Sequence, residues 1–330
     1  MSVPTLEEIR PVGVDIGLWS VAGAAAPTLV VTSSRRLADP LPVLETAVAM
    51  LGRPVVKVAL AHPADDLDEA AEYVIAQVVE RGEQQILDLT PECGHSMLAT
   101  ATHLAAHSHR TAGQLWLRLL TCRSGKRRIV TCEVRPHPDS HVVTGGDGDE
   151  EYEAGLRFPL DDPATVFPLG TGWFLLSVAG REVPVTVIDS GNPYAFVDAR
   201  SVGITDGAAL FSAGPESAVL LAEVRRQVAP RIGLAASAVL PKPALLLHPI
   251  ADVAYVRALS AEDWHPALAL TGQIAVATLL AASATGDIDL TIHHPGGVAD
   301  VGLRADPDGG RTLVVARRRV VRLTPLCEAR

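Results

Sequence analysis

A cysteine and a lysine occupy positions where their surroundings would make them reactive in proton transfer. Cys93 lies in TPECGHS, directly before an apolar segment with helical spacing at 95–107. A thiol at a helix N-terminus lies near the positive end of the helix dipole and near unpaired backbone N–H groups, which favour the thiolate and lower the pKa of the thiol. The same N–H groups can hold a substrate carboxylate. The alternative interpretation is a small buried cysteine without chemistry.

The second candidate, Lys57, lies within the strand-like run VVKVAL at 55–60. A lysine inside an apolar strand is costly unless it faces a cleft or a carboxylate. Burial would also lower its pKa toward the range that general acids and bases use. The alternative is an edge strand from which the lysine reaches water. We expect the Lys57 amine and the Cys93 sulfur to point at one small volume.

Other candidates are weaker. DSGNP at 189–193 is a tight turn after a strand, from which Asn192 could contact a substrate, although turn chemistry alone explains the pattern. His103, His107 and His109 fall at a helix end, where a solvated face is a simpler interpretation than a metal site. Neither GxGxxG nor GxxxxGK[ST] occurs, so nucleotide binding has no support.

The elements that must position these residues are short strands and a few helices. Short β-branched runs between Gly, Pro or Asp predict strands at 29–33, 55–60, 114–122, 127–134, 173–180, 183–189, 244–250, 288–294 and 311–323. Alanine- and leucine-rich segments predict helices at 42–52, 67–81, 95–107, 217–233 and 271–283. The apolar helices after Cys93 and after Thr271–Gly272 are alike, and strands flank both. We therefore expect an α+β fold with internal pseudo-symmetry, in which a sheet curls around one helix per domain.

The bulk properties limit the classes of function. A length of 330 residues suits two domains of about 150 residues, with the acidic stretch 144–155 as a boundary or exposed hairpin. The net charge of −10 argues against nucleic acid as a partner, and the run Arg317–Arg319 is typical of a solvated strand or helix end. Four cysteines form neither a disulfide framework nor CxxC spacing. No signal peptide or membrane-spanning run is visible, so we expect a cytoplasmic protein.

Taken in order along the chain, several motifs resemble one known family. They are Lys57 in VVKVAL, Cys93–Gly94, DSGNPYAFVDA, WHPALALTG, IHHPGG and RTLVVARRRV. As a set they look like the 2-methylaconitate cis–trans isomerase family, whose relatives include methylitaconate Δ-isomerase and oxalomesaconate tautomerase. The resemblance extends from Lys57 to the C-terminus.

This resemblance implies the diaminopimelate epimerase-like fold. Such a fold has two similar domains, each a curled, mostly antiparallel sheet around a central helix, with the active site in the cleft between them. The last strand would return to the first domain, which then comprises 1–149 plus 312–330, while the second comprises 150–311. Members use no metal, nucleotide or pyridoxal cofactor, so we expect none here.

The resemblance also assigns roles to residues. The catalytic lysine of the family falls on Lys57 and the catalytic cysteine on Cys93. The positions implied to bind substrate are Gly94, His95, Ser96, Asn192, Thr271, Gly272 and His265. The expected reaction moves a double bond or a stereocentre of a small unsaturated organic acid by proton transfer.

The chain departs from the family pattern in three places, of which one is the glycine-rich loop before the lysine strand: here Leu51–Gly52–Arg53–Pro54 runs straight into VVK. Family members begin with an arginine- and glycine-rich segment that helps to bind carboxylates, whereas VAGAAAPT at 21–28 carries no charge. An Asn-Cys-Gly-Asn motif has become Glu92-Cys93-Gly94-His95. Losing an arginine removes a bidentate clamp, and Glu92 would repel a polyanion. We therefore expect a substrate less anionic than methylaconitate, in secondary metabolism, and a monomer or homodimer.

Two alternatives remain open on the same scaffold. One is a repurposed enzyme such as a cyclase, in which the altered cleft folds and holds an apolar substrate. The other is a non-catalytic binding protein that has lost the chemistry. The uncharged 21–28 segment favours both alternatives, whereas the presence of Lys57 together with Cys93 favours catalysis.

Overall fold

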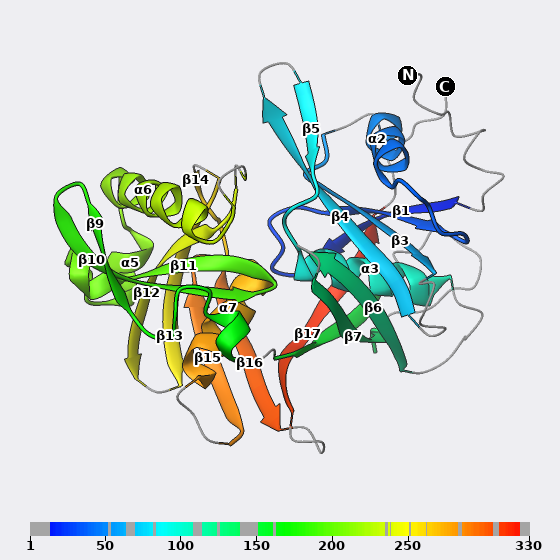
Figure 1. The fold of residues 1–330 in the computed structure, drawn as a ribbon. Coiled ribbons are helices and arrows are strands. Elements are labelled where there is room, and N and C mark those ends of the chain that lie inside the picture. The colour runs from blue at the N-terminus through cyan, green and yellow to red at the C-terminus, as the bar shows by residue number, and fades with distance from the viewer. Residues whose placement is uncertain are drawn as a thin grey trace. The chain divides into compact units, whose positions relative to one another are not determined.

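A computed structural model describes residues 14–323 apart from short gaps (Figure 1). The gaps are 52–53, 64–69, 82–83, 108–113, 124–125, 139–150, 161–162, 235–236, 238, 251, 262, 283–285 and 306–309. The chain forms two compact units, of which unit 1 comprises Met1–Arg157 with Arg317–Arg330 and unit 2 comprises Phe158–Ala316. No described helix has the length and apolar character needed to cross a membrane.

Unit 1 is a ring of strands around one helix. Its elements are β1 (Val14–Val21), β2 (Thr28–Ser33), α2 (Leu41–Met50), β3 (Lys57–Pro63), β4 (Ala70–Arg81), β5 (Gln84–Asp88), α3 (Gly94–Ala106), β6 (Leu115–Arg123), β7 (Lys126–Pro136), most of β8 (Glu151–Pro159) and the end of β17 (Arg311–Leu323). The strands pair in the order β17-β1-β2-β3-β4-β6-β7-β8, and β8 also pairs with β17. The pairs β2–β3 and β4–β6 are parallel, whereas the others with a defined register are antiparallel.

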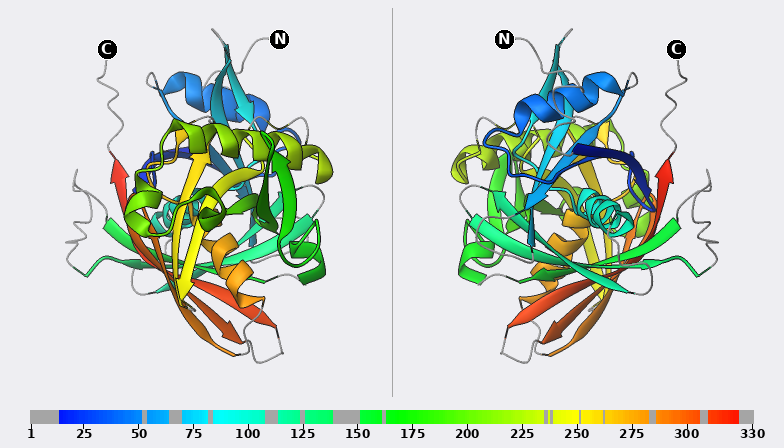
Figure 2. Two further views of the ribbon diagram at one scale, coloured as in Figure 1. Left: turned by 90° about the vertical axis from the view of Figure 1, so that its left-hand side faces the viewer. Right: turned by 90° about the vertical axis from the view of Figure 1, so that its right-hand side faces the viewer.

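The helix at the centre of this ring, α3, is buried almost all round. Every residue from Gly94 to His103 is buried, and the helix contacts β1, β2, β3, β6 and β7. A helix with apolar or small side chains on all faces has no solvent side and is stable only inside such a shell. Figure 2 shows α3 among the strands of its own unit.

Unit 2 repeats the same plan. Its elements are α4 (Pro163–Val166), β9 (Phe174–Val178), β10 (Arg181–Ser190), β11 (Asn192–Asp198), the 3-10 helix η2 (Ala199–Val202), α5 (Gly207–Phe211), α6 (Pro215–Arg231), β12 (Lys242–Ile250), β13 (Val253–Ser260), β14 (Asp263–Trp264), α7 (Leu270–Ala281), β15 (Ile288–His294) and β16 (Gly297–Ala305). The parallel pairs are β11–β12 and β13–β15, and α7 packs on β10, β11, β15 and β16. Both units thus have two parallel pairs separated by an antiparallel pair, with the buried helix placed before the last parallel strand.

This architecture confirms the predicted α+β fold of two similar domains, each a curled, mostly antiparallel sheet around a central helix. The repeat also makes positions in the two units equivalent. Lys57 begins β3 as Lys242 begins β12, and Cys93 precedes α3 as Ala269 precedes α7.

The helix predicted at 67–81 is wrong, because the described part of this segment forms β4. Tyr73, Ile75 and Ala76 are buried, and β4 pairs with β3, β5 and β6. Its aromatic and β-branched residues suit a strand packed between neighbours, and this tertiary pairing outweighs the helical propensity of its alanines. The stretch 144–155 is not simply an exposed hairpin either: 144–150 lie outside the described residues, and 151–155 belong to β8 with Ala154 buried.

Candidate active site

Cys93 is the N-cap residue of α3. Its backbone is extended (φ −143°, ψ 107°), and its carbonyl accepts hydrogen bonds from the Met97 N–H at 3.0 Å and the Tyr73 hydroxyl at 3.3 Å. The thiol is free and partly exposed, whereas the next three residues, Gly94–Ser96, are buried in the first turn. The sulfur therefore lies where the first amides of the helix and their dipole act on it.

Lys57 lies close enough to act on this thiol. It is the half-buried first residue of β3, paired with Thr28 on β2 and Gln77 on β4. Burial alone would raise the pKa of Cys93, but the positive charge of Lys57 and hydrogen bonds from His95 and Ser96 lower this pKa well below its ordinary value. Because β3 is flanked on both sides, the edge-strand interpretation of Lys57 is wrong.

His95 and Ser96 hold the thiolate from the first turn of α3. Burial lowers the pKa of His95, and Lys57 and Arg318 lower it further against the opposing effect of Cys93, so the imidazole is neutral and donates to the sulfur. Its Nε2 is buried and has no hydrogen-bond partner in the described part of the chain. Nδ1 is therefore the nitrogen that bonds Cys93. Ser96 Oγ is 2.9 Å from Thr28 Oγ1, which ties the first turn of α3 to β2.

Tyr73 completes the surroundings of the cysteine. Burial raises the pKa of its hydroxyl well above the ordinary value, and the charges of Cys93 and Glu92 raise it further. The phenol therefore stays protonated and acts as a donor to the Cys93 carbonyl rather than as a base. Tyr73 was not predicted as a site residue because 67–81 was predicted to be a helix; the aromatic and β-branched run Tyr73-Val74-Ile75 was the available signal for a strand.

The three arginines of β17 have different surroundings: Arg317 and Arg319 are exposed, as expected of a solvated strand, whereas Arg318 is partly buried. Arg317 forms an ion pair with Glu133, and Arg319 forms one with Glu151. Since neighbouring side chains on a strand point to opposite faces, Arg318 lies on the other face together with the fully buried Val320.

The other predicted site residues lie in unit 2. Asn192 is fully buried, and its Nδ2 donates to Thr271 Oγ1 at 3.2 Å, which joins the turn after β10 to the first turn of α7. Gly272 is needed for packing, because a Cβ there would lie 2.7 Å from both the Tyr194 hydroxyl and Leu268 Cδ1. His265 is partly exposed, and its Nδ1 accepts a hydrogen bond from the Ala267 N–H at 3.0 Å.

The predicted solvated histidine face is wrong for His103, which is fully buried, and His109 lies outside the described residues. His103, His107 and Asp15 bring their ligand atoms within 4.8 Å of one another, as a metal site would. However, the Trp19 indole N–H donates to His103 Nδ1 at 3.1 Å. A neutral imidazole must then carry its proton on Nε2, so that nitrogen cannot bind a metal while the bond exists. The three residues form a hydrogen-bonded cluster.

This cluster predicts acid sensitivity. Burial, His107 and Arg322 together lower the pKa of His103 to about 3. Since an unfolded histidine titrates near 6.5, the unfolded chain binds more protons between these values, and stability falls as the pH falls through that window. We expect His103 to cost roughly 1–2 kcal/mol of unfolding free energy between pH 7 and pH 5. Urea unfolding of wild type and His103→Gln at both pH values should show this difference, and equal pH dependence in the two proteins would contradict it.

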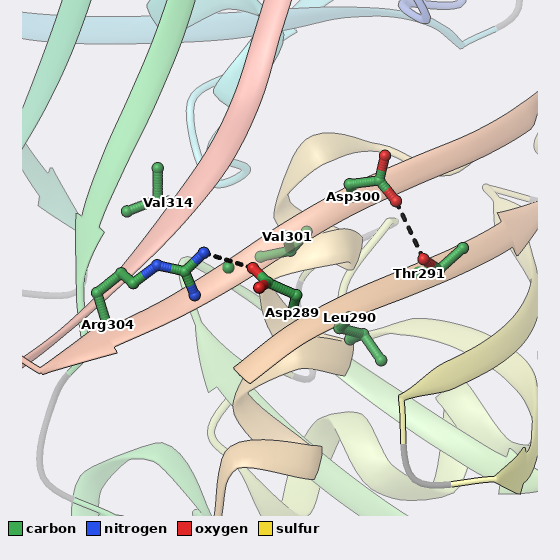
Figure 3. Close-up of a pocket in the computed structure, with 8 residues that line it drawn as sticks. Asp289, Leu290, Thr291, Asp300, Val301, Arg304 and Val314 are labelled. Carbon is green, nitrogen blue, oxygen red and sulfur yellow. Dashed lines mark hydrogen bonds and ion pairs between the residues drawn. The ribbon is translucent and has the colours of Figure 1, made fainter. Parts of the chain in front are cut away.

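A hollow of about 380 Å³ lies on β15, β16 and β17 of unit 2 (Figure 3). Its polar groups satisfy one another: Arg304 forms an ion pair with Asp289, and the Thr291 hydroxyl donates to Asp300 at 3.1 Å. It contains none of the predicted site residues, so the thiol at the start of α3 is the better candidate for chemistry.

Solved structures with the same fold include the following three. Methylitaconate-delta-isomerase has a TM-score of 0.66 at 18% identity, with 94% of this chain and 93% of that chain covered. A hydroxyproline epimerase from Agrobacterium vitis has 0.55 at 15%, covering 93% and 89%. A probable proline racemase from Agrobacterium radiobacter K84 has 0.52 at 15%, covering 96% and 94%. These likenesses establish the diaminopimelate epimerase-like fold.

The chain belongs to the PrpF protein family, which matches residues 156–325, just over half of its length. No curated protein sequence matches the chain. Family membership confirms the resemblance found in the sequence.

Proposed function

We propose that this protein is an isomerase that moves a double bond in a small unsaturated organic acid, with Cys93 and Lys57 as its acid–base pair. The observation that carries the proposal is the electrostatic pairing of the two side chains at the N-terminus of α3, which lowers the pKa of the thiol. Retention of this pair favours catalysis over a non-catalytic binding protein, which has no need of an activated thiol.

The chemistry follows from the charges. The Cys93 thiolate removes a proton from the carbon next to the double bond, and negative charge spreads over an enolate-like intermediate. The Lys57 ammonium and the backbone N–H groups of the first turn of α3 stabilise this charge. Lys57 then returns a proton at the far carbon of the double bond, and transfer from the thiol to the amine restores both groups. The net proton count is zero, so the proposed reaction needs no cofactor.

The internal repeat favours a double-bond shift over racemisation. A two-base racemase needs a proton acceptor on one face of the substrate carbon and a proton donor on the other. The position equivalent to Cys93 is Ala269, which cannot titrate. Both proposed acid–base groups therefore belong to unit 1.

The nature of the substrate is part of the proposal. The segment 21–28 has no charged side chain and Glu92 is buried next to Cys93, so we propose a substrate with fewer carboxylates than methylaconitate. Gly94, His95, Ser96, Asn192, Thr271, Gly272 and His265 are proposed to bind it. A setting in secondary metabolism, a cytoplasmic location and a monomeric or homodimeric state stay predictions.

Deuterium exchange tests this function. Wild-type protein is incubated in heavy water with a panel of unsaturated mono-, di- and tricarboxylic acids, and proton NMR follows the allylic and vinylic positions. We expect deuterium at the carbons that lose and gain a proton, strongest for acids with one or two carboxylates. A folded protein that exchanges no acid in the panel would support the non-catalytic alternative.

A further inference from the structure

The strand β17 runs beside the site at the start of α3. Val320 pairs with Val21 on β1, and the Ala22 N–H donates to the Arg319 carbonyl at 2.9 Å. The next residue, Gly23, adjoins His95, because a Cβ on Gly23 would lie 3.8 Å from His95 Nε2. The part of β17 around Arg319 therefore borders the first turn of α3.

Another residue of β17, Arg322, lies near the other end of α3. Arg322 places its guanidinium 5.9 Å from the centre of the Trp19 ring, and Trp19 donates to His103 near the end of α3. Arg318 lies four residues before Arg322, on the same face of β17. The charge of Arg318 acts on His95 at the start of α3, and the charge of Arg322 acts on His103 near the end of the helix.

Arg318 is a candidate for binding a substrate carboxylate near Cys93. Lys57 is engaged with the thiolate, and 21–28 supplies no cation. The charge of Arg318 reaches the first turn, where it helps to lower the pKa of His95. The buried Nε2 of His95 has no hydrogen-bond partner in the described part of the chain; because the ring proton is on Nδ1, this atom is an acceptor and does not itself bind a carboxylate.

We propose that Arg318 binds the substrate carboxylate beside Cys93 and so selects an acid that presents one carboxylate to this end of α3. The proposal rests on the function proposed above. Guanidinium suits this role because its planar fork can bind a carboxylate through two parallel hydrogen bonds. Arg318 touches the substrate in this assignment, whereas Arg317 and Arg319 are held on the outer face by Glu133 and Glu151.

Two alkylating reagents test the proposal without knowledge of the substrate. Iodoacetate and iodoacetamide both form a C–S bond with the thiolate and release iodide, but only iodoacetate carries a carboxylate. Mass spectrometry of the Cys93 peptide follows both alkylation rates. Each rate is proportional to the thiolate fraction, so this fraction cancels when the iodoacetate rate is divided by the iodoacetamide rate. Relative to a free thiol such as glutathione, we expect this ratio to be about five- to tenfold higher in the wild type.

Arg318→Gln should lower the ratio about five- to tenfold. Arg318→Lys should keep part of the preference for iodoacetate, because lysine retains the charge without the planar fork. The matched variant Arg317→Gln should change the ratio less than about twofold. High salt should move the wild-type ratio toward that of glutathione, which provides a test even if Arg318→Gln does not fold. Equal ratios in wild type and Arg318→Gln, or a wild-type ratio that is insensitive to salt, would overturn the proposal. If Cys93 reacts slowly with both reagents but the ratio still depends on Arg318, the proposed thiolate form of Cys93 is refuted. The proposed carboxylate-binding role of Arg318 is then still supported.

Discussion

Cys93→Ser is expected to slow deuterium exchange into the substrate by at least about 1,000-fold. Serine keeps the shape of the side chain, but its hydroxyl does not ionise near neutral pH and cannot remove a carbon-bound proton. Exchange is measured by proton NMR in heavy water, with the acid that wild type exchanges fastest.

The matched control is Cys132→Ala, in the same unit. Cys132 is fully buried on β7, and burial raises the pKa of its thiol to about 12. Its removal should lower stability through a lost packing contact and leave the exchange rate per folded molecule unchanged. Full exchange in Cys93→Ser would remove the cysteine from the mechanism.

Lys57→Met is expected to raise the pKa of Cys93, because the charge that lowers this pKa is lost. Each unit of increase reduces the thiolate fraction tenfold at a pH below the pKa, so alkylation of Cys93 by iodoacetamide at pH 7 should slow by about 10–100-fold. The rate should recover toward that of the wild type at alkaline pH. Peptide-resolved mass spectrometry over a range of pH gives the whole titration.

Lys57→Arg separates the two roles proposed for this lysine. Arginine keeps the charge, so the thiol should stay reactive, but its pKa above about 12 prevents it from delivering a proton. We expect rapid alkylation together with loss of deuterium exchange. If Lys57→Met alkylates at the wild-type rate across the pH range, Lys57 does not act on the thiol.

The periodicity of the sequence was sufficient to predict the two apolar helices and most strands, because burial inside a shell leaves a continuous apolar run. The position of Cys93 before α3 was likewise visible. Thr28, Tyr73 and Arg318 could not be assigned to the site, since their roles arise from strand pairing between distant segments. Thr28 meets Lys57 through the β2–β3 register, and Tyr73 reaches Cys93 only when β4 is a strand.

The arginine run shows why composition alone is a poor guide to a charged segment. As a string, Arg317–Arg319 is uniform, but a strand sends alternate side chains to opposite faces. Two of the three form ion pairs on the outer face, and the middle one faces the side of α3. The strand predicted at 311–323 already implies this division, but it does not show which face carries chemistry.

The path of β17 also has a consequence for biosynthesis. Unit 1 needs this strand to close its ring, yet the whole of unit 2 separates Arg317 from Arg157. As the chain leaves the ribosome, unit 2 can complete its sheet up to Ala316 while the earlier half still lacks its closing strand. Unit 1, which contains the reactive thiol, is therefore the last to reach its native structure. Until then its unpaired strand edges are exposed, and such edges promote aggregation.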